Sequence, residues 1–179
     1  MSGERARDEG EPRRKPPGDR ARVSTFVAVT PQDAFDVFTR ETDLWWRRGP
    51  KFRFGGQRRG TLTLEPALGG RLFEAFDDGP ADVFVVGRVL AWEPGARIVL
   101  EWRLPNFAPG ERTEVEVLFQ TAPGGTNVSL EHRGWSALPS GHPARHGLDA
   151  PAAVGEIGLW WGEQLVAMRQ HALEKAGRA

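Results

Sequence analysis

The amino-acid sequence predicts an α+β domain in which a seven-stranded antiparallel sheet packs one apolar face against a long C-terminal helix. Two observations lead to this fold class. Residues 61–133 contain six short segments with alternating apolar and polar side chains, separated by turn residues such as Gly, Pro and Asp. Residues 150–175 instead carry apolar side chains at helical spacing, with no proline after position 151.

The N-terminal elements are predicted from propensity and capping residues. Residues 22–29 are short and rich in β-branched side chains, as in a strand. Thr30 then suits the N-cap of a first short helix, with Pro31 in its first position and Asp33 near the positive end of its dipole. A second short helical turn is expected at 42–46.

Turn residues divide the middle of the chain into strands joined as an antiparallel meander. The six strands are expected at 61–65, 71–76, 82–92, 97–104, 112–120 and 126–133. Residues 134–150 are rich in Gly, Pro and His and predict a loop. The final helix is expected to begin after Asp149, its N-cap, and to end near Lys175.

One face of the final helix is predicted to be packed. Its apolar members recur three or four residues apart: Ile157, Trp161, Leu165, Met168 and Ala172. Gly155, Gly158 and Gly162 lie on the flank of this face, and each costs about 1 kcal/mol relative to Ala within a helix. We favour close approach of the helix to the sheet as their reason, and room for a ligand is the alternative.

Composition excludes several classes of protein. The chain has no Cys, which excludes disulfide frameworks, thiolate metal sites and a cysteine nucleophile. Its 24 basic residues balance 24 acidic ones, which argues against a bulk binder of nucleic acid. No apolar run is long enough for a membrane span, and the charged start lacks a secretory signal, so we expect a cytoplasmic protein. Seven Trp and no Tyr favour a large apolar interior or pocket.

Residues 1–20 are expected to form a disordered tail ahead of a single domain at 21–176. The tail contains six basic and five acidic residues, three prolines and almost no apolar side chains. A nucleic-acid-binding arm is one interpretation of it, but the near balance of charge favours a solvated linker.

The ordered set of segments resembles a known superfamily. From Val23 to about Met168 the chain reads VAVTPQDAFDVFT, WW, LEPALGGRLFE, a DDG turn, VGRVLAWEPGARIVLEWR, TEVEVLFQ and GGTNVSLEHRGW, and then a terminal helix that contains WW. This order resembles the START-like helix-grip superfamily, also written SRPBCC. Within it the chain is most similar to the branch related to the C-terminal domain of the activator of the heat-shock chaperone ATPase. The terminal helix departs from the pattern, because it has Gly158-Leu159-Trp160-Trp161 where Gly-Trp is expected.

The resemblance implies the helix-grip fold, in which a curved seven-stranded sheet wraps the long helix and two short helices follow the first strand. It also implies a cavity between sheet and helix. Members of the superfamily bind lipids, sterols or polyketides, a few catalyse cyclisation or hydrolysis, and others act as co-chaperones. Because one fold hosts all these functions, the residues of the site must decide among them.

Strand parity gives candidate residues for the wall of that cavity. Segments 97–104, 112–120 and 126–133 each turn an apolar set to one side. Parity does not decide which face of 82–92 points inward, nor which of Phe73 and Glu74 does. The predicted cavity residues are Phe73, Glu74, Ile98, Leu100, Trp102, Val115, Val117, Phe119, Leu130, His132, Trp135, Trp161 and Leu165. Ordinary close-packed core is the alternative for each of them.

Catalytic chemistry has little support in the sequence. His132 could serve as an acid or base, with Glu74 across the pocket, but a hydrogen-bonded core histidine is the preferred interpretation. His142, His146 and Asp149 have a spacing that can bind zinc on a helix, but neighbouring Pro and Gly favour a loop. We therefore predict no catalytic residue, no metal and no cofactor.

A basic and aromatic segment lies between Asp43 and Glu65, where no other acidic residue occurs. We predict that it forms a lip at the cavity mouth for an acidic partner protein or for the acidic end of an amphiphilic ligand. A solvated loop is the alternative, and RNA is a weaker one. The predicted lip residues are Trp45, Trp46, Arg47, Arg48, Arg53, Arg58 and Arg59.

The primary functional prediction is a non-enzymatic protein that holds a small apolar or amphiphilic molecule between sheet and helix. The first alternative is a co-chaperone-like module that acts on a chaperone ATPase or another acidic protein. The second alternative is an enzyme of the cyclase or hydrolase type that uses the same cavity. Nucleic acid and membranes are not expected partners.

Overall fold

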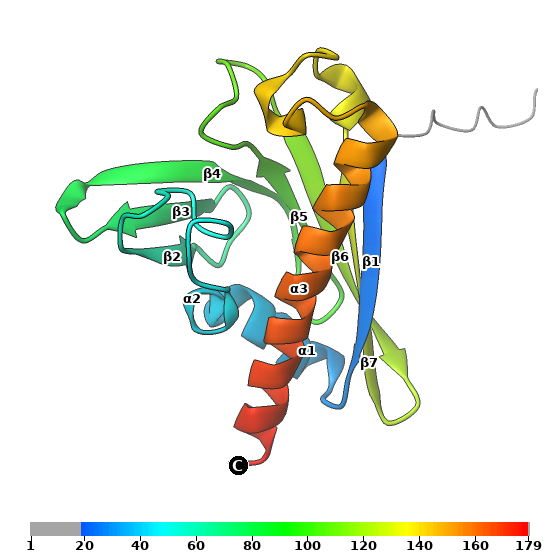
Figure 1. Cartoon of the computed structure of the whole chain (residues 1–179). Coiled ribbons are helices and arrows are strands. Elements are labelled where there is room, and N and C mark those ends of the chain that lie inside the picture. Colours follow the sequence, from blue (N-terminus) through cyan, green and yellow to red (C-terminus); the bar gives the residue numbers. More distant parts are fainter. Residues whose placement is uncertain (1–18, 179) are drawn as a thin grey trace, which may run out of the picture.

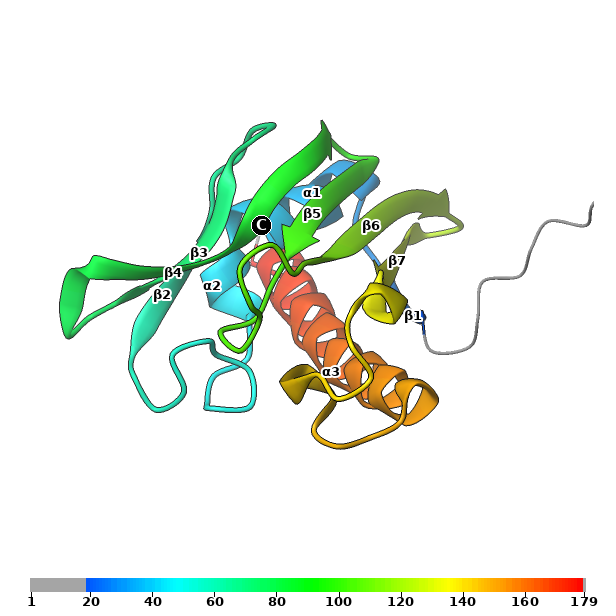
Figure 2. The ribbon, with the colours of Figure 1, turned by 90° about the horizontal axis from the view of Figure 1, so that it is seen from above.

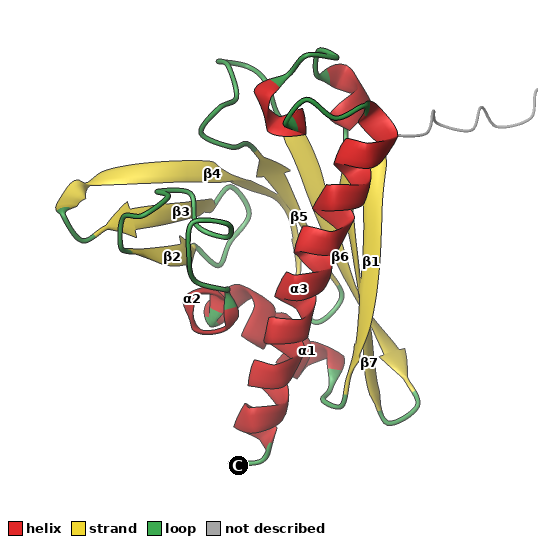
Figure 3. Cartoon of the chain, in the orientation of Figure 1, coloured by secondary structure: helices red, strands yellow, loops and turns green. Residues whose placement is uncertain are grey.

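Seven antiparallel strands form one curved sheet that wraps around a long helix in this computed structural model (Figure 1, Figure 3). The structure describes residues 19–178. The strand order is β1-β7-β6-β5-β4-β3-β2, and this confirms the predicted α+β helix-grip fold. The elements in chain order are β1 (Arg20–Val27), α1 (Pro31–Arg40), α2 (Thr42–Trp45), β2 (Gly60–Leu64), β3 (Arg71–Phe76), β4 (Gly79–Glu93), β5 (Arg97–Trp102), β6 (Thr113–Ala122), β7 (Gly125–Arg133) and α3 (Ala150–Ala176).

The observed elements follow the predicted order, and their ends differ from the predicted ones by three residues or fewer. The predicted loop at 134–150 contains two short 3₁₀ turns, Trp135–Ala137 and Pro143–Arg145. Strand β1 begins at Arg20, inside the predicted tail, and Asp19 before it is buried. The rest of that tail, residues 1–18, lies outside the described residues.

Both predicted helix starts are confirmed by their caps. The Thr30 hydroxyl accepts a hydrogen bond from the Asp33 backbone N–H at 3.1 Å, and Pro31 opens α1. The Asp149 carboxylate accepts one from the Ala152 N–H at 2.9 Å at the start of α3. These caps satisfy backbone donors that the first helical turn would otherwise leave without partners.

Strand β4 changes face along its length. The register of its pairing shifts next to Leu72 and Phe73 in β3, and again between Val89 and Ala91 opposite β5. Val86 and Val89 are therefore both buried although they are three residues apart. A bulge adds an unpaired residue and reverses the alternation beyond it, so no single parity describes this strand.

Helix α3 lies in the concave face of the sheet, which curves around it from β1 to the β2–β4 end (Figure 2). The predicted packed face is confirmed, because Trp161, Leu165, Met168 and Ala172 are buried and Ile157 is half-buried. None of the described helices is long and apolar enough to cross a membrane.

Close packing against the sheet does not explain two of the three glycines on the flank of α3. A Cβ on Gly158 would meet the Ala21 Cβ at 3.9 Å, which is ordinary van der Waals contact. A Cβ on Gly155 or Gly162 would meet nothing within 4 Å. Close approach to the sheet therefore does not require these two glycines, and that prediction is wrong for them.

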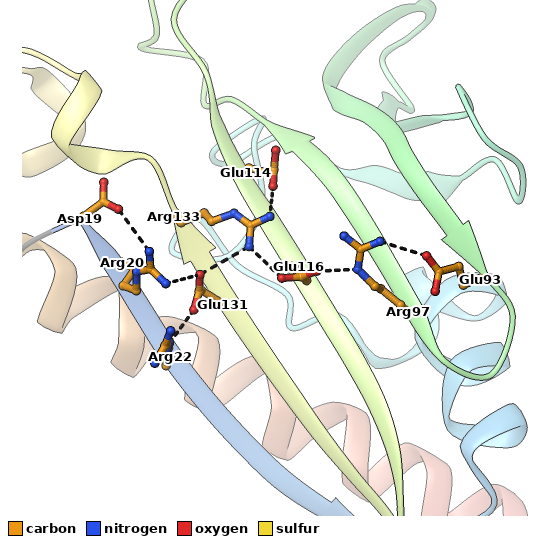
Figure 4. Close-up of polar contacts among 9 residues, drawn as sticks. All are labelled: Asp19, Arg20, Arg22, Glu93, Arg97, Glu114, Glu116, Glu131 and Arg133. Carbon is orange, nitrogen blue, oxygen red and sulfur yellow. Dashed lines mark hydrogen bonds and ion pairs between the residues drawn. The ribbon is translucent and has the colours of Figure 1, made fainter. Parts of the chain in front are cut away.

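The outer face of the sheet carries a ladder of ion pairs (Figure 4). Arg133 on β7 is shared by three glutamates: its Nη1 lies 2.7 Å from Glu116 and 3.5 Å from Glu131, and its Nη2 pairs with Glu114. Glu116 and Glu131 are direct cross-strand neighbours, a position where like charges are destabilising. Arg133 offsets this repulsion by standing between them.

Further arginines complete the ladder. Arg97 pairs with Glu116 at 2.5 Å and with Glu93 at 3.0 Å, while Arg20 lies 2.9 Å from Glu131. Partial burial tends to raise the pKa of Glu116, but hydrogen bonds from Arg97 and Arg133 outweigh it and leave that pKa lowered. The pKa of Glu131 is lowered in the same way by its arginine neighbours, against the opposing effect of burial.

Candidate functional site: an aromatic and polar cluster under the α2–β2 loop

Most predicted cavity residues lie on the concave face of the sheet or on the buried face of α3. Those that the structure buries there are Glu74, Ile98, Leu100, Trp102, Val115, Val117, Phe119, Leu130, His132, Trp161 and Leu165. They meet in one interior, and all but Glu74 and His132 belong to the main hydrophobic core.

Two predicted cavity residues lie elsewhere. Phe73 is on the opposite face of β3 from Glu74, half-buried, with the Arg71 guanidinium 4.7 Å from its ring centroid. Trp135 is buried in a second, smaller core with Phe107 and other residues of the loops beyond the sheet. Strand parity places Phe73 and Glu74 on opposite faces of β3 but does not say which face is buried. Trp135 follows the end of β7, so the alternation of that strand does not apply to it.

His132 is a hydrogen-bonded core histidine. The Trp161 indole N–H donates to its Nδ1 at 3.0 Å, and an indole nitrogen can only donate, so the proton of the neutral ring resides on Nε2. Nε2 then donates to the Thr113 hydroxyl at 2.7 Å, and that hydroxyl donates to the Trp102 carbonyl at 3.3 Å. Complete burial lowers the pKa of His132 to about 3.

Both ring nitrogens of His132 are therefore occupied, and the ring is neutral at physiological pH. This arrangement supports the preferred interpretation of the residue and leaves no nitrogen for acid or base chemistry. The suggested pairing of His132 with Glu74 is absent from the described contacts, because Glu74 binds backbone groups of the α2–β2 loop instead.

An aromatic cluster fills the space between α3, β4, β5 and the α2–β2 loop, residues 46–59. Trp46 lies at its centre, with ring centroids 6.1 Å from Trp102, 5.7 Å from Trp160 and 5.7 Å from Trp161. We use the name aromatic cluster for Trp46, Phe52, Phe54, Phe84, Trp102, Trp160 and Trp161. Phe54, Phe84 and Trp160 are only partly buried, so the cluster reaches the surface at the loop.

A buried carboxylate fastens the α2–β2 loop to the sheet. Glu74 is fully buried, and its Oε2 accepts hydrogen bonds from the backbone N–H groups of Phe54 at 2.8 Å and Gly55 at 3.2 Å. Arg53 lies beside it, with Nη1 3.7 Å from Glu74 Oε1 and 2.7 Å from Asp43 Oδ1. The Arg53 side chain is 4% exposed, so its charge depends on these two carboxylates.

Asp43 links this pair to the edge of the sheet. Its Oδ1 also accepts from the Leu62 N–H at 2.8 Å, and the neighbouring Arg48 donates to the Gly60 carbonyl at 3.4 Å. Partial burial tends to raise the pKa of Asp43, but hydrogen bonds from Leu62 and Arg53 outweigh it and leave the pKa lowered. Both bonds occupy groups of β2, which is an edge strand.

Helix α3 fastens the same loop from the other side. The fully buried Gln164 accepts from the Arg47 backbone N–H at 3.0 Å through its Oε1. The Trp160 indole N–H donates to the Lys51 carbonyl at 2.8 Å, and Lys51 itself pairs with Glu163 at 2.5 Å. The loop is thus held by side chains of α3 and β3 that lie far from it in sequence.

Two buried polar atoms of this region have no hydrogen-bond partner among the described residues. They are Glu74 Oε1, an acceptor, and Gln164 Nε2, a donor. Buried polar groups are normally hydrogen-bonded, and leaving one unsatisfied costs about 1–3 kcal/mol.

The segment predicted as a basic lip does not present all of its residues as a free charged surface. Trp45, Trp46 and Arg53 are buried, and Trp45 donates to the Val37 carbonyl at 3.0 Å. Acidic residues from outside the segment, or at its boundary, neutralise most of its cations. The pairs are Arg47 with Glu163, Arg48 with Asp43, and Arg58 with Asp78 and Asp82. Arg59 is exposed.

Two hollows open on the outer side of the sheet. One, of about 530 Å³, is lined by Glu101, Arg112, Glu114 and Arg133, among others. The second, of about 490 Å³, lies over β1, β7 and β6. Neither lies between the sheet and α3, where the aromatic rings contact one another.

No group of three His, Asp or Glu side chains within residues 19–178 is placed to hold a metal ion. His142 contacts Glu111 at 2.8 Å and accepts from the Ala144 N–H, and Asp149 caps α3. His146 is the C-cap of the second 3₁₀ turn. The residues with the zinc-like spacing therefore take part in local hydrogen bonds and caps.

Several members of this site are absent from the residues predicted from the sequence. Asp43 and Gln164 are not among them, and Trp160 appears only as part of the WW pair. The phenylalanines of the aromatic cluster, Phe52, Phe54 and Phe84, are absent as well. One sequence feature indicates Gln164: it is a polar residue directly before Leu165 on the packed side of α3. A polar residue buried there needs a hydrogen-bond partner.

The curved sheet, the long C-terminal helix and the cluster between them define a START-like helix-grip domain. Within that class the chain belongs to the family described as Activator of Hsp90 ATPase homolog 1-like protein, whose model matches residues 26–155. The resemblance inferred from the sequence segments is thereby confirmed.

Several solved structures are similar to this chain. A protein from Mesorhizobium loti is 21% identical with a TM-score of 0.58, covering 87% of this chain and 97% of that one. An Hsp90 activator from Plasmodium falciparum is 14% identical with a TM-score of 0.53, covering 79% and 87%. An anthrahydroquino-gamma-pyrone synthase, solved in a complex, is 29% identical with a TM-score of 0.53, covering 86% and 98%. Among curated proteins, no sequence matches this chain significantly.

Proposed function

We propose that this domain binds a flat, largely apolar small molecule within the aromatic cluster, beneath the α2–β2 loop, and that it does so without catalysis. The aromatic cluster is the observation that carries the proposal. Seven rings from the loop, two strands and α3 meet there, and three of them are only partly buried. Stacking and edge contacts with such rings favour planar ligands.

The loop supplies the route of entry. Phe52 stacks on Trp160 at 6.1 Å, and Phe54 lies 5.6 Å from Phe84, so both rings leave the cluster when the loop lifts. The loop turns at Gly49 and Gly56, which have φ of 97° and 65°, and hydrogen bonds to side chains hold it. Segments held in this way open at lower free energy than strands within a sheet.

The alternatives have less support from the site. An enzyme of the cyclase or hydrolase type would draw on His132, but both of its ring nitrogens are occupied, and one Glu74 oxygen holds the loop. The co-chaperone hypothesis depended on a basic lip whose cations are largely paired. The relative named as an anthrahydroquino-gamma-pyrone synthase favours a fused-ring ligand.

Equilibrium dialysis with 9,10-anthraquinone tests this function. We expect saturable binding of one molecule per chain, weakened about threefold to tenfold by Phe54→Ala, which removes one ring of the cluster. Leu159→Ala is the matched control, because Leu159 is 66% exposed and lies beside Trp160 on α3. The proposal fails if binding does not saturate, or if both variants bind like the wild type.

A further inference from the structure

We propose that Glu74 and Gln164 select ligands that carry both a hydrogen-bond donor and a hydrogen-bond acceptor, which makes hydroxylated aromatic carbonyl compounds the preferred class. This inference rests on the proposed function, because it concerns the polar groups beside the same aromatic cluster. It assigns a recognition role to two buried side chains whose described contacts are with the protein's own loop.

Glu74 supplies the acceptor. One carboxylate oxygen, Oε2, is occupied by the backbone N–H groups of Phe54 and Gly55. The other, Oε1, is buried without a hydrogen-bond donor, and its nearest cation, Arg53 Nη1, lies at 3.7 Å. That distance is beyond a hydrogen bond, so the oxygen keeps its capacity for a donor such as a phenolic hydroxyl.

Gln164 supplies the donor. Its Oε1 accepts from the Arg47 N–H at 3.0 Å, which fixes the orientation of the amide and directs the NH₂ group away from that bond. The Nε2 atom is buried and has no acceptor in the part of the chain that the structure describes. A ligand carbonyl is the complementary partner.

Neither side chain can turn to satisfy its free atom without losing a loop contact. Each residue commits one oxygen to backbone N–H groups of the α2–β2 loop: Gln164 to Arg47 near its start, and Glu74 to Phe54 and Gly55 further along. The two free atoms are thus held in place by the same bonds that close the loop. A polar atom that is fixed and desolvated before binding discriminates strongly among ligands.

Gly60 packs closely against β3 beside the acceptor. A Cβ at this position would lie 2.8 Å from the Ala75 carbonyl oxygen, 2.9 Å from Glu74 Cγ and 3.1 Å from Glu74 Oε1. A side chain there would displace the Glu74 carboxylate, so the position of Oε1 depends on this glycine.

Four matched probes measure the proposed selectivity: naphthalene, 2-naphthol, 2-acetonaphthone and 6-hydroxy-2-acetonaphthone. They share one ring system and differ only in the donor and the acceptor. We expect the wild type to bind the last probe best and naphthalene worst in equilibrium dialysis. A hydrogen bond to the Glu74 carboxylate corresponds to about a tenfold to hundredfold gain in affinity for the hydroxylated probes.

Glu74→Gln is the decisive variant, because it preserves shape and keeps one oxygen for the loop. It replaces the free acceptor with an NH₂ donor, so the preference for 2-naphthol over naphthalene should disappear. Gln164→Met should instead remove the preference for 2-acetonaphthone. Melting temperatures of both variants establish that the fold is retained, and the Glu74→Gln result stands alone if Gln164→Met does not fold.

The outcomes separate the two proposals. If the wild type binds all four probes with equal affinity, or if Glu74→Gln keeps the preference for 2-naphthol, this inference is wrong and the proposed function stands. If the wild type binds none of the four probes, both are overturned. The loss of one specific preference in each variant, with naphthalene binding unchanged, supports the inference.

Discussion

Two regions of the molecule place an arginine between carboxylates, and they use it differently. On the outer face Arg133 is shared by three glutamates, and each of those glutamates has its own hydrogen bond. Under the α2–β2 loop the buried Arg53 stands between Asp43 and Glu74, and one Glu74 oxygen is left without a donor. The outer ladder is partly exposed and complete, whereas the inner network is buried and incomplete.

The two networks imply different roles for their arginines. A partly exposed network in which every charge is paired offsets repulsion between neighbouring glutamates and needs no further partner. A buried network that leaves an acceptor unsatisfied weakens the fold, so its presence indicates a use other than stability. We therefore expect the two networks to respond differently to substitution, acid and salt.

The largest expected effect comes from breaking the inner network. Arg53→Met leaves Asp43 and Glu74 without their shared cation, and we expect a loss of about 3–5 kcal/mol in the free energy of unfolding. Urea denaturation measures it, with Arg59→Met as the control because Arg59 is exposed. A loss below about 1 kcal/mol would show that solvent reaches the network, contrary to its burial in the structure.

Acid should weaken the core through His132. Burial lowers its pKa from 6.5 to about 3, so the unfolded chain binds a proton that the folded chain excludes. Stability is then full above about pH 6.5 and falls as the pH drops, by about 1.4 kcal/mol per pH unit. Denaturation midpoints between pH 7 and about pH 5 measure this loss, and His132→Gln should flatten it.

The carboxylates respond in a lower range of pH. The pKa values of Glu116, Glu131 and Asp43 are lowered in the folded protein, so their contribution is present above the unfolded pKa and is lost as the pH falls further. The control for the His132 prediction is His146→Gln, because His146 is exposed. Parallel pH profiles for wild type and His132→Gln would contradict the assignment of the neutral ring.

The smallest effect is expected on the outer face. Arg133→Gln leaves Glu116 opposite Glu131, and we expect a loss of about 1–2 kcal/mol at low salt. In 1 M NaCl the Debye length is about 3 Å, so the loss should shrink there, while the loss in Arg53→Met should persist. Arg112→Gln, on the same side of the sheet, serves as the control. An equal response of both losses to salt would erase the distinction between the two networks.

Local sequence signals were sufficient for the fold. Thr30 and Asp149 cap their helices as expected, and turn residues separate the strands where the structure ends them. Parity fails in β4, where the register shifts let Val86 and Val89 face the same side. A bulge depends on the partner strand, which periodicity within one segment does not describe.

The sequence predicted only part of the site, because contacts between distant segments determine the rest. The segment around Arg53 is free of acids in sequence, but Asp43, Asp78 and Glu163 reach its cations in space. Those acids come from α2, the β3–β4 turn and α3, so the neutralisation is a tertiary effect. Burial of Glu74 instead of Phe73 was equally undecidable, because only the loop that covers β3 supplies donors for the carboxylate.

Asp43 also protects an exposed strand edge from pairing with a strand of another molecule. A free strand edge is a template on which another strand can add, and β2 is such an edge. Asp43 occupies the Leu62 N–H and Arg48 occupies the Gly60 carbonyl, so both groups are unavailable to a visiting strand. Because Asp43 also holds Arg53, any opening of the loop that breaks these contacts bares the edge as well. The attachment of the loop and the protection of the β2 edge therefore depend on the same carboxylate.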